Sequence, residues 1–249
     1  MTVTESHQLD ATALGGDRAE VVVHGHFGRP VLWFPSEAGS PHDFVGGGIL
    51  DAVRGAVDDG LIKIFCVPSF DNESWSASWK PLSDRAKAHL AYENWILQQV
   101  VPFIQRQCAG RTDIATAGTS LGAFHAVLFA LRHAHLFPHA VAMSGSYDPR
   151  LWRGWGSRTD DVYFTNPMEF VQGLHGGHLD YLRSTVRISL VVGSGQWEDT
   201  TGALSSTIAM AEVLQHQSIP RDLFVWGREW PHDWPSWRAQ AAVYLPSLG

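Results

Sequence analysis

The sequence has few cysteines, little positive charge and no apolar run long enough to span a bilayer. Its two cysteines, Cys66 and Cys108, are too few for a disulfide scaffold, and we expect two reduced thiols. The 18 Lys and Arg residues stand against 25 Asp and Glu residues, which gives a formal net charge of -7. Nucleic-acid binding as the main task would call for a basic surface, so this balance argues against it. The missing apolar run argues against membrane insertion.

The first residues, MTVTESHQLDATALGGD, contain neither a basic segment nor an apolar one. We therefore expect no secretory signal and a cytoplasmic protein. Hydrophobic residues make up 45% of the chain and charged residues 17%, a balance typical of a folded chain with a large core.

Short apolar runs of β type alternate with longer helical patterns, which predicts an α/β fold with a mostly parallel central sheet and helices on both faces. The predicted strands cover residues 18–25, 29–36, 61–69, 112–118, 139–145, 187–195 and 222–227. The predicted helices cover residues 83–108, 121–132, 206–217 and 234–244. Within the first helix, Ser83 is the candidate N-cap and Pro102 predicts a kink or a restart.

The segment of about 147–185 is rich in Gly, Trp, Asp and His and interrupts this alternation. We expect it to form a small insertion over one end of the sheet. No repeat, linker or low-complexity tract divides the chain, so residues 1–249 are predicted to form a single domain.

The stretch ATAGTSLGAFHA places Gly118 and Gly122 two residues either side of Ser120. The pattern G-x-S-x-G is a weak signal alone, but here a strand-like run precedes it and a helical run follows it. In that setting it predicts a nucleophile elbow, a sharp turn on which side chains at the two glycines would collide with the neighbouring strand and helix. The turn would expose the Ser120 hydroxyl and leave the Leu121 backbone N–H free to stabilise an oxyanion.

A serine nucleophile needs a base, and in this architecture the base follows the last strand. The segment GREWPHDWPSW lies there, and His232 is its only histidine. His175 and His178 in HGGH could suggest a metal pair, but no cysteine or further ligand cluster supports one, and we expect no metal.

The acid of such a triad should come from the loop GSGQWEDTTG, which offers Glu198 and Asp199. A turn that presents an acid three residues after a glycine selects Glu198 when counted from Gly195, and Asp199 could instead cap the following helix. Asp148 is a third option, although it follows the wrong strand.

The second oxyanion donor is expected from the loop PSEAGSPHDF, with the backbone N–H of Glu37 or Ala38 as candidates. The eleven tryptophans include several in loop-like segments. This is typical either of rigid loop packing or of an aromatic-lined pocket.

Three segments, GTSLGAFHAVLFALRHAHLFPHAVAMSGSYD, VYFTNPMEF and PHDWPSWR, resemble the putative-esterase family of α/β-hydrolases. This family includes S-formylglutathione hydrolases, feruloyl esterases, enterochelin esterase and mycolyltransferases. The resemblance runs from about Val31 to the C-terminus. It implies a sheet of the eight-strand type, no cofactor, and ester hydrolysis with Ser120 as nucleophile, His232 as base and the acid from the Glu198/Asp199 loop. It also implies that residues 71–79 lie beside the active site.

The sequence thus predicts a serine esterase that cleaves a small-molecule carboxylic ester through an acyl-enzyme. Two alternatives stay open at this point. One is an acyltransferase that uses the same triad, and the other is a non-catalytic α/β-hydrolase scaffold.

Overall fold

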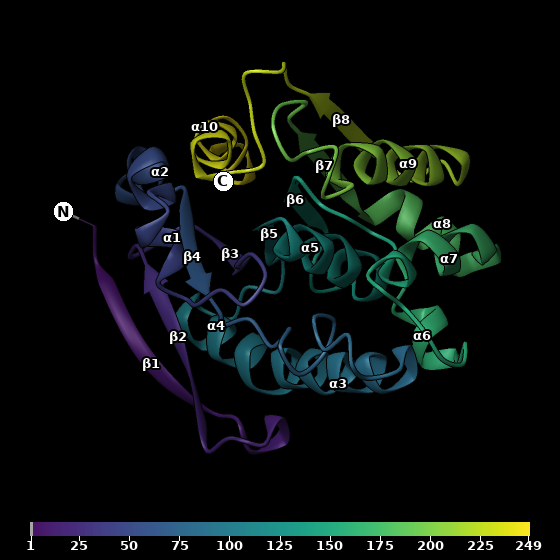
Figure 1. Cartoon of the computed structure of the whole chain (residues 1–249). Helices are drawn as coiled ribbons and strands as arrows, with labels where there is room; N and C mark the ends of the chain where they lie inside the picture. Colours follow the sequence, from purple (N-terminus) through teal and green to yellow (C-terminus); the bar gives the residue numbers. More distant parts are fainter. Residues whose placement is uncertain (1) are drawn as a thin grey trace.

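The computed structural model describes residues 2–249, and its centre is an eight-stranded sheet in the order β1-β2-β4-β3-β5-β6-β7-β8 (Figure 1). The β1–β2 and β2–β4 pairs are antiparallel, and all the other pairs are parallel. The strands are β1 (Thr4–Asp10), β2 (Arg18–His24), β3 (Arg29–Phe34), β4 (Ile62–Cys66), β5 (Ala115–Thr119), β6 (His139–Met143), β7 (Arg187–Val192) and β8 (Arg221–Val225).

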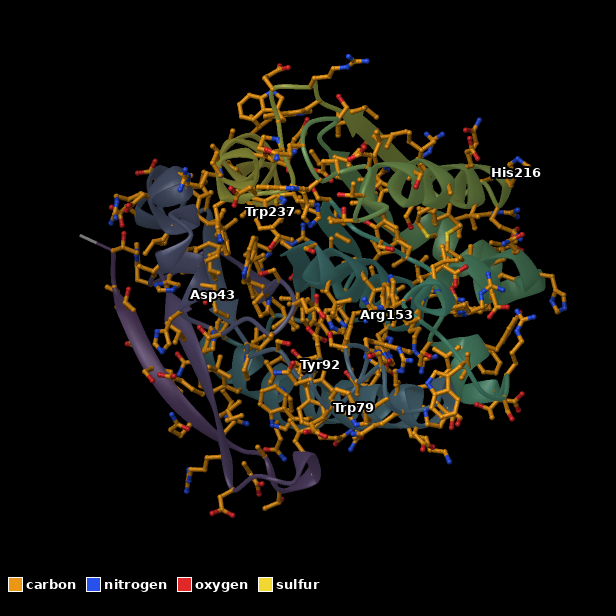
Figure 2. All side chains as sticks on the ribbon, viewed as in Figure 1. Asp43, Trp79, Tyr92, Arg153, His216 and Trp237 are labelled. Atoms are coloured by element: carbon orange, nitrogen blue, oxygen red, sulfur yellow. The ribbon has the colours of Figure 1, made fainter. Side chains whose placement is uncertain are left out.

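Helices cover both faces of the sheet, as predicted (Figure 1). One face carries α1 (Asp43–Gly46), α2 (Ile49–Asp58) and α10 (Trp234–Tyr244). The other face carries α3 (Leu82–Trp95), α4 (Val101–Gln107), α5 (Leu121–Arg132) and α9 (Ala203–His216). In the view of Figure 2, His216 marks the outer end of α9 and Trp237 lies on α10.

Strand β3 shows why both faces must be covered. Val31 and Trp33 pack under α2 and α10, whereas Leu32 and Phe34 pack under α3 to α5. All four side chains are fully buried. A strand buried on both sides reads as a continuous apolar run, and such runs are typical of parallel sheets.

Strand β1 and helix α2 are the longest elements outside the predicted insertion that were not predicted. Strand β1 carries mostly exposed, polar residues, so it has no apolar face to reveal it, and it is held at the sheet edge by its pairing with β2. Helix α2 does bury apolar residues at helical spacing, among them Ile49, Val53 and Val57.

The long predicted helix of residues 83–108 differs in two details. It begins at Leu82 after Pro81, so Ser83 is not its N-cap; the Ser83 hydroxyl contacts Asp84 instead. A π-helical turn over Ile96–Val100 separates α3 from α4, and Pro102 occupies the first turn of α4. Because proline has no N–H to donate to the preceding turn, the restart comes just ahead of it.

Between β6 and β7 lie α6 (Asp160–Phe164), α7 (Pro167–Phe170) and α8 (Gly176–Thr185), within the segment predicted as an insertion. Their buried residues Val162, Phe170 and Leu182 pack into the same core cluster as α5 and α9. Among residues 2–249, no helix combines the length and apolar character that crossing a membrane requires.

Candidate active site

Ser120 sits on the sharp turn between β5 and α5, in a backbone conformation with φ 54° and ψ -119°. A positive φ is costly for any residue but glycine, and such outliers gather at functional sites. A Cβ on Gly122 would lie 2.2 Å from the Phe34 carbonyl oxygen, and one on Gly118 would lie 2.4 Å from the carbonyl oxygen of Gly122. The two glycines are therefore required by main-chain contacts of the turn, as predicted.

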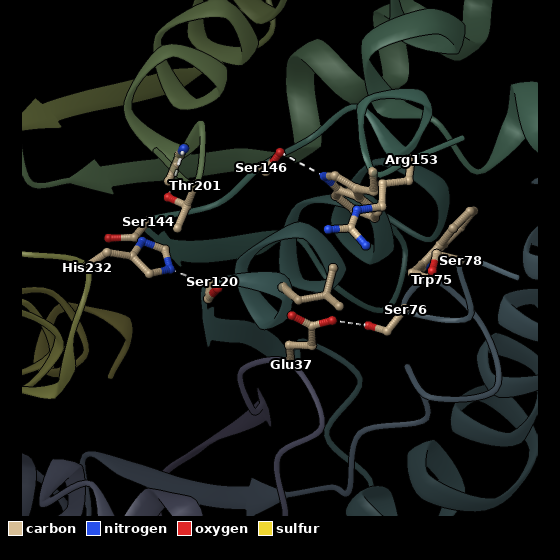
Figure 3. A pocket seen from close by; sticks show the side chains of 13 residues that line it. Glu37, Trp75, Ser76, Ser78, Ser120, Ser144, Ser146, Arg153, Thr201 and His232 are labelled. Atoms are coloured by element: carbon tan, nitrogen blue, oxygen red, sulfur yellow. Dashed lines mark hydrogen bonds between the residues drawn. The ribbon is translucent and has the colours of Figure 1, made fainter. Parts of the chain in front are cut away.

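His232 follows β8 and reaches Ser120 across the carboxyl edge of the sheet (Figure 3). Its Nε2 lies 3.0 Å from the Ser120 Oγ, which places the hydroxyl in position to donate a hydrogen bond to the ring. Trp237 packs edge-on against the imidazole with a centroid distance of 5.1 Å, and this contact restricts the orientation of the ring.

Glu198 is the acidic side chain that contacts His232. Its Oε2 lies 3.0 Å from His232 Nδ1, while its Oε1 accepts hydrogen bonds from the Ser144 hydroxyl at 2.5 Å and the Gly193 amide at 3.3 Å. The Glu198 side chain is fully buried. A buried carboxylate is tolerated only when its oxygens are bonded, and here both are.

The other two acids considered from the sequence lie elsewhere. Asp199 is exposed, and its carboxylate accepts a hydrogen bond from the Thr200 amide. It does not cap α9, which begins earlier than predicted, after Gly202. Asp148 is paired with Arg150 and also bonded by Asn166.

The acid loop and the histidine loop are joined through their main chains. The Gly195 amide donates to the Trp230 carbonyl at 3.0 Å, and the His232 amide donates to the Gln196 carbonyl at 2.9 Å. A Cβ on Gly193 would lie 2.1 Å from the Trp230 carbonyl oxygen. This close approach explains the glycines of the GSG segment and fixes the distance between Glu198 and His232.

Three backbone amides, those of Leu121, Glu37 and Ala38, are candidates for an oxyanion site, and Leu121 and Glu37 line the same cavity as Ser120. The N–H of Leu121 belongs to the first turn of α5, where no helical acceptor exists. Within residues 2–249, neither this amide nor those of Glu37 and Ala38 donates a hydrogen bond. Ala38 has a φ of 55°, so the loop that carries Glu37 and Ala38 also holds a strained conformation.

Ser120 and His232 open into a cavity of about 470 Å³ (Figure 3). Cavities of this size suit small molecules. The residues that line it are Glu37, Trp75, Ser76, Ser78, Ser120, Leu121, Ser144, Ser146, Trp152, Arg153, Thr201, Ala203 and His232. Both interpretations of the tryptophans apply, since Trp75 and Trp152 line the cavity whereas Trp237 packs against the histidine. The placement of Trp75, Ser76 and Ser78 also agrees with the expectation for residues 71–79.

Sequence reasoning missed several polar residues that position this cavity. Arg85 is fully buried and donates to the carbonyl oxygens of five residues in the two loops that form the cavity wall: Trp75, Ser78, Lys80, Trp152 and Arg153. Asp71, also buried, pairs with His125 of α5 at 3.0 Å and ties the first of these loops to the helix. An arginine inside a helix carries no sequence signal that separates a buried role from an exposed one.

Several buried groups outside the cavity have displaced pKa values. Burial lowers the pKa of His89 to about 3, and the nearby His125 acts in the same direction. Burial raises the pKa of Glu93, but hydrogen bonds from His133 and Arg132 outweigh it and hold the pKa at about 2. Within the described residues, no group of three or more His, Cys, Asp or Glu side chains could hold a metal ion, and His175 and His178 belong to no such group.

Comparison with known proteins gives a family match and several structural likenesses. A family model described as "Putative esterase" matches residues 51–248. A ferulic acid esterase has a TM-score of 0.74 at 16% identity, with 100% of this chain and 97% of that chain covered. An S-formylglutathione hydrolase from Agrobacterium tumefaciens has a TM-score of 0.72 at 13% identity, with 99% and 94% covered.

A third structure, MPT51 of Mycobacterium tuberculosis, has a TM-score of 0.65 at 15% identity, with 99% of this chain and 97% of that chain covered. No curated protein matches the sequence. At these identities the structural likenesses establish a shared α/β-hydrolase fold. The family match covers most of the chain.

Proposed function

Because the chain belongs to the putative-esterase family, we propose that it hydrolyses a small-molecule carboxylic ester with Ser120 as nucleophile, His232 as general base and Glu198 as the acid. The observation that carries the proposal is the unbroken series of contacts from Ser120 Oγ to His232 Nε2 and from His232 Nδ1 to Glu198 Oε2, each 3.0 Å long. These distances lie within hydrogen-bond reach, which is the geometric requirement for proton transfer.

In the first step, the Ser120 oxygen attacks the ester carbonyl while its proton passes to His232 Nε2. The Glu198 carboxylate accepts the Nδ1–H of the ring, keeps Nε2 available as the base, and stabilises the imidazolium that forms. The carbonyl oxygen becomes an oxyanion, which the Leu121 amide and an amide of Glu37 or Ala38 stabilise. Removing one such donor typically costs about 3 kcal/mol of barrier.

The imidazolium then gives its proton to the departing alcohol, and the acyl group stays on Ser120. In the second half, water loses a proton to His232 and attacks the acyl-enzyme, which releases the acid and restores the serine. No step of this mechanism requires a cofactor.

The test is replacement of Ser120 with alanine. The Ser120→Ala variant should lose about 10⁴-fold or more in kcat on a simple aryl ester, because the nucleophile is gone. Its circular dichroism spectrum and melting temperature should match those of the wild type. A variant that retains a tenth of the wild-type rate contradicts the proposal.

A fluorophosphonate probe gives a second measurement. Peptide mapping should place the adduct on Ser120, and the adduct should vanish in Ser120→Ala. The matched control is Ser146→Ala, which removes another hydroxyl of the same cavity and should keep the label. An adduct on Ser144 or Ser146 in the wild type would assign the nucleophile elsewhere.

A further inference from the structure

Arg153 is the one Lys or Arg side chain that lines the cavity, as far as residues 2–249 show. Figure 3 shows its guanidinium extending from the ribbon into the cavity, on the side that faces Glu37 and Ser120. A positive charge at this place is therefore available to whatever occupies the cavity.

The guanidinium of Arg153 has no carboxylate within 4.0 Å and makes no side-chain hydrogen bond within the described part of the chain. The neighbouring carboxylates are already engaged. Asp148 pairs with Arg150 at 2.5 Å, and Glu169 pairs with both Arg150 and Arg158. Two arginines of this segment are thus neutralised by acids, and Arg153 is not.

The backbone holds Arg153 in an uncommon conformation, with φ 52°. This region of φ costs roughly 1 kcal/mol or more for a residue with a side chain. The conformation is held by Arg85, which donates to the carbonyl oxygens of Trp152 and Arg153, each at 2.8 Å. A fully buried arginine therefore holds the main chain from which the exposed Arg153 side chain extends to the cavity.

Glu37 is the acid of the same cavity, and its charge shapes what Arg153 can accept. Its Oε1 accepts a hydrogen bond from the Ser76 hydroxyl. An anionic group near Glu37 is repelled, whereas one near Arg153 is attracted and can form two parallel hydrogen bonds to the guanidinium. The cavity therefore discriminates by the position of a negative charge.

We propose that Arg153 binds a carboxylate carried by the substrate, so that the preferred ester has an anionic group on one side of the scissile bond. This inference rests on the proposed function of the site and adds the substrate class. It makes Arg153 a residue that determines specificity by direct contact with the substrate.

The test compares esters that differ only in charge. The first pair is mono-4-nitrophenyl glutarate and its methyl ester, which place the charge on the acyl side. The second pair is 4-acetoxybenzoate and its methyl ester, which place it on the alcohol side. In at least one pair, Arg153→Met should lower the ratio of kcat/KM for the charged over the neutral ester by tenfold or more. Arg153→Lys should lower it less, because lysine keeps the charge but not the fork of donors.

The matched control is Arg106→Met, which removes an exposed arginine of α4 and should leave both ratios within twofold of the wild type. The ratio in the wild type should also shrink at 1 M NaCl, since part of the attraction is screened. The inference is overturned if the ratios in Arg153→Met equal those of the wild type in both pairs. An Arg153 side chain that pairs with Glu37 in solution would give this result, because it would not bind the substrate carboxylate.

A binding measurement separates this inference from the proposed function. In Ser120→Ala, monomethyl glutarate should quench the fluorescence of the cavity tryptophans Trp75 and Trp152, and adding Arg153→Met should weaken binding tenfold. If the wild type hydrolyses no ester, the proposed function fails, and this titration still decides whether Arg153 binds a carboxylate. Equal affinity with and without Arg153 overturns the inference.

Discussion

Replacing Glu198 with glutamine removes the charge that faces His232 and keeps the size of the side chain. Three donors surround the Glu198 carboxylate: His232 Nδ1–H, the Ser144 hydroxyl and the Gly193 amide. A carboxylate accepts from all three, whereas a glutamine side chain has a single acceptor oxygen. Either orientation of the amide therefore opposes a donor to another donor.

If the new NH₂ group faces His232, the ring must turn Nδ1 into an acceptor and place its proton on Nε2. The ring then cannot take a proton from Ser120. If the amide oxygen of the glutamine faces His232, its NH₂ group meets the Gly193 N–H, which is also a donor. In this orientation too, the imidazolium formed during the reaction lacks the negative charge that Glu198 supplies. A wrong tautomer of this kind costs about 10⁴ in kcat, or about 5 kcal/mol of barrier. We expect a loss of 10³- to 10⁴-fold in Glu198→Gln.

The assay is steady-state hydrolysis of a 4-nitrophenyl ester at neutral pH. KM should change less than threefold, because Glu198 does not line the cavity. The control is Asp199→Asn, which alters the neighbouring acid and should keep at least half of the activity, since that side chain is exposed. A Glu198→Gln variant with more than a tenth of the wild-type kcat, or a large loss in Asp199→Asn, would refute this assignment of the acid.

Two further predictions concern stability. Gly122→Ala should lower the free energy of unfolding by more than about 3 kcal/mol in urea titrations, because its Cβ would overlap the Phe34 carbonyl oxygen. The control is Gly55→Ala in α2, whose Cβ would meet no neighbour within 4 Å. This variant should raise the free energy of unfolding by about 0.5–1 kcal/mol. In the unfolded chain His89 takes up a proton near pH 6.5, whereas in the folded chain it does so only near pH 3. The free energy of unfolding therefore falls as the pH falls between these two values. For this one ring the fall is at most about 1.4 kcal/mol per pH unit. His89→Leu should show a shallower decline in the same titrations between pH 7 and 4, and slopes equal to those of the wild type would contradict the assigned pKa.

Much of the fold could be predicted because buried strands are recognisable in the sequence as short, mainly apolar runs. Strands β3 to β7 are buried along most of their length, and their order relative to the helices is typical of a parallel sheet covered on both faces. β1 was not predicted because pairing at the sheet edge uses only backbone groups. The mostly exposed side chains of Thr4–Asp10 therefore show no pattern that indicates a strand. The helical spacing of α2 was present in the sequence but follows the glycine run of residues 46–48, which is typical of a loop.

The residues of the candidate site also fall into two groups, those that the sequence could locate and those that it could not. Ser120 and Leu121 could be located because a turn between strand and helix imposes glycine at two fixed positions, and such a requirement is visible in the sequence. Ser144 and Arg85 could not be located, since their contacts join segments far apart in the chain. Ser144 is 54 residues from Glu198, and Arg85 is 67 residues from Trp152. The role of each depends on the tertiary fold alone.

The acid loop shows why spacing from a glycine is an uncertain guide to a catalytic residue. Gly193 and Gly195 are each required by the approach of the Arg228–Trp230 main chain, where a Cβ would lie within 2.6 Å of a carbonyl oxygen. Their positions are set by contact with the histidine loop and not by the turn that presents the acid. Because the same contacts hold the main chain of His232 against Gln196, the two loops form one unit. Glu198 is then the acid of that unit which points inward, while Asp199, one residue further, faces solvent.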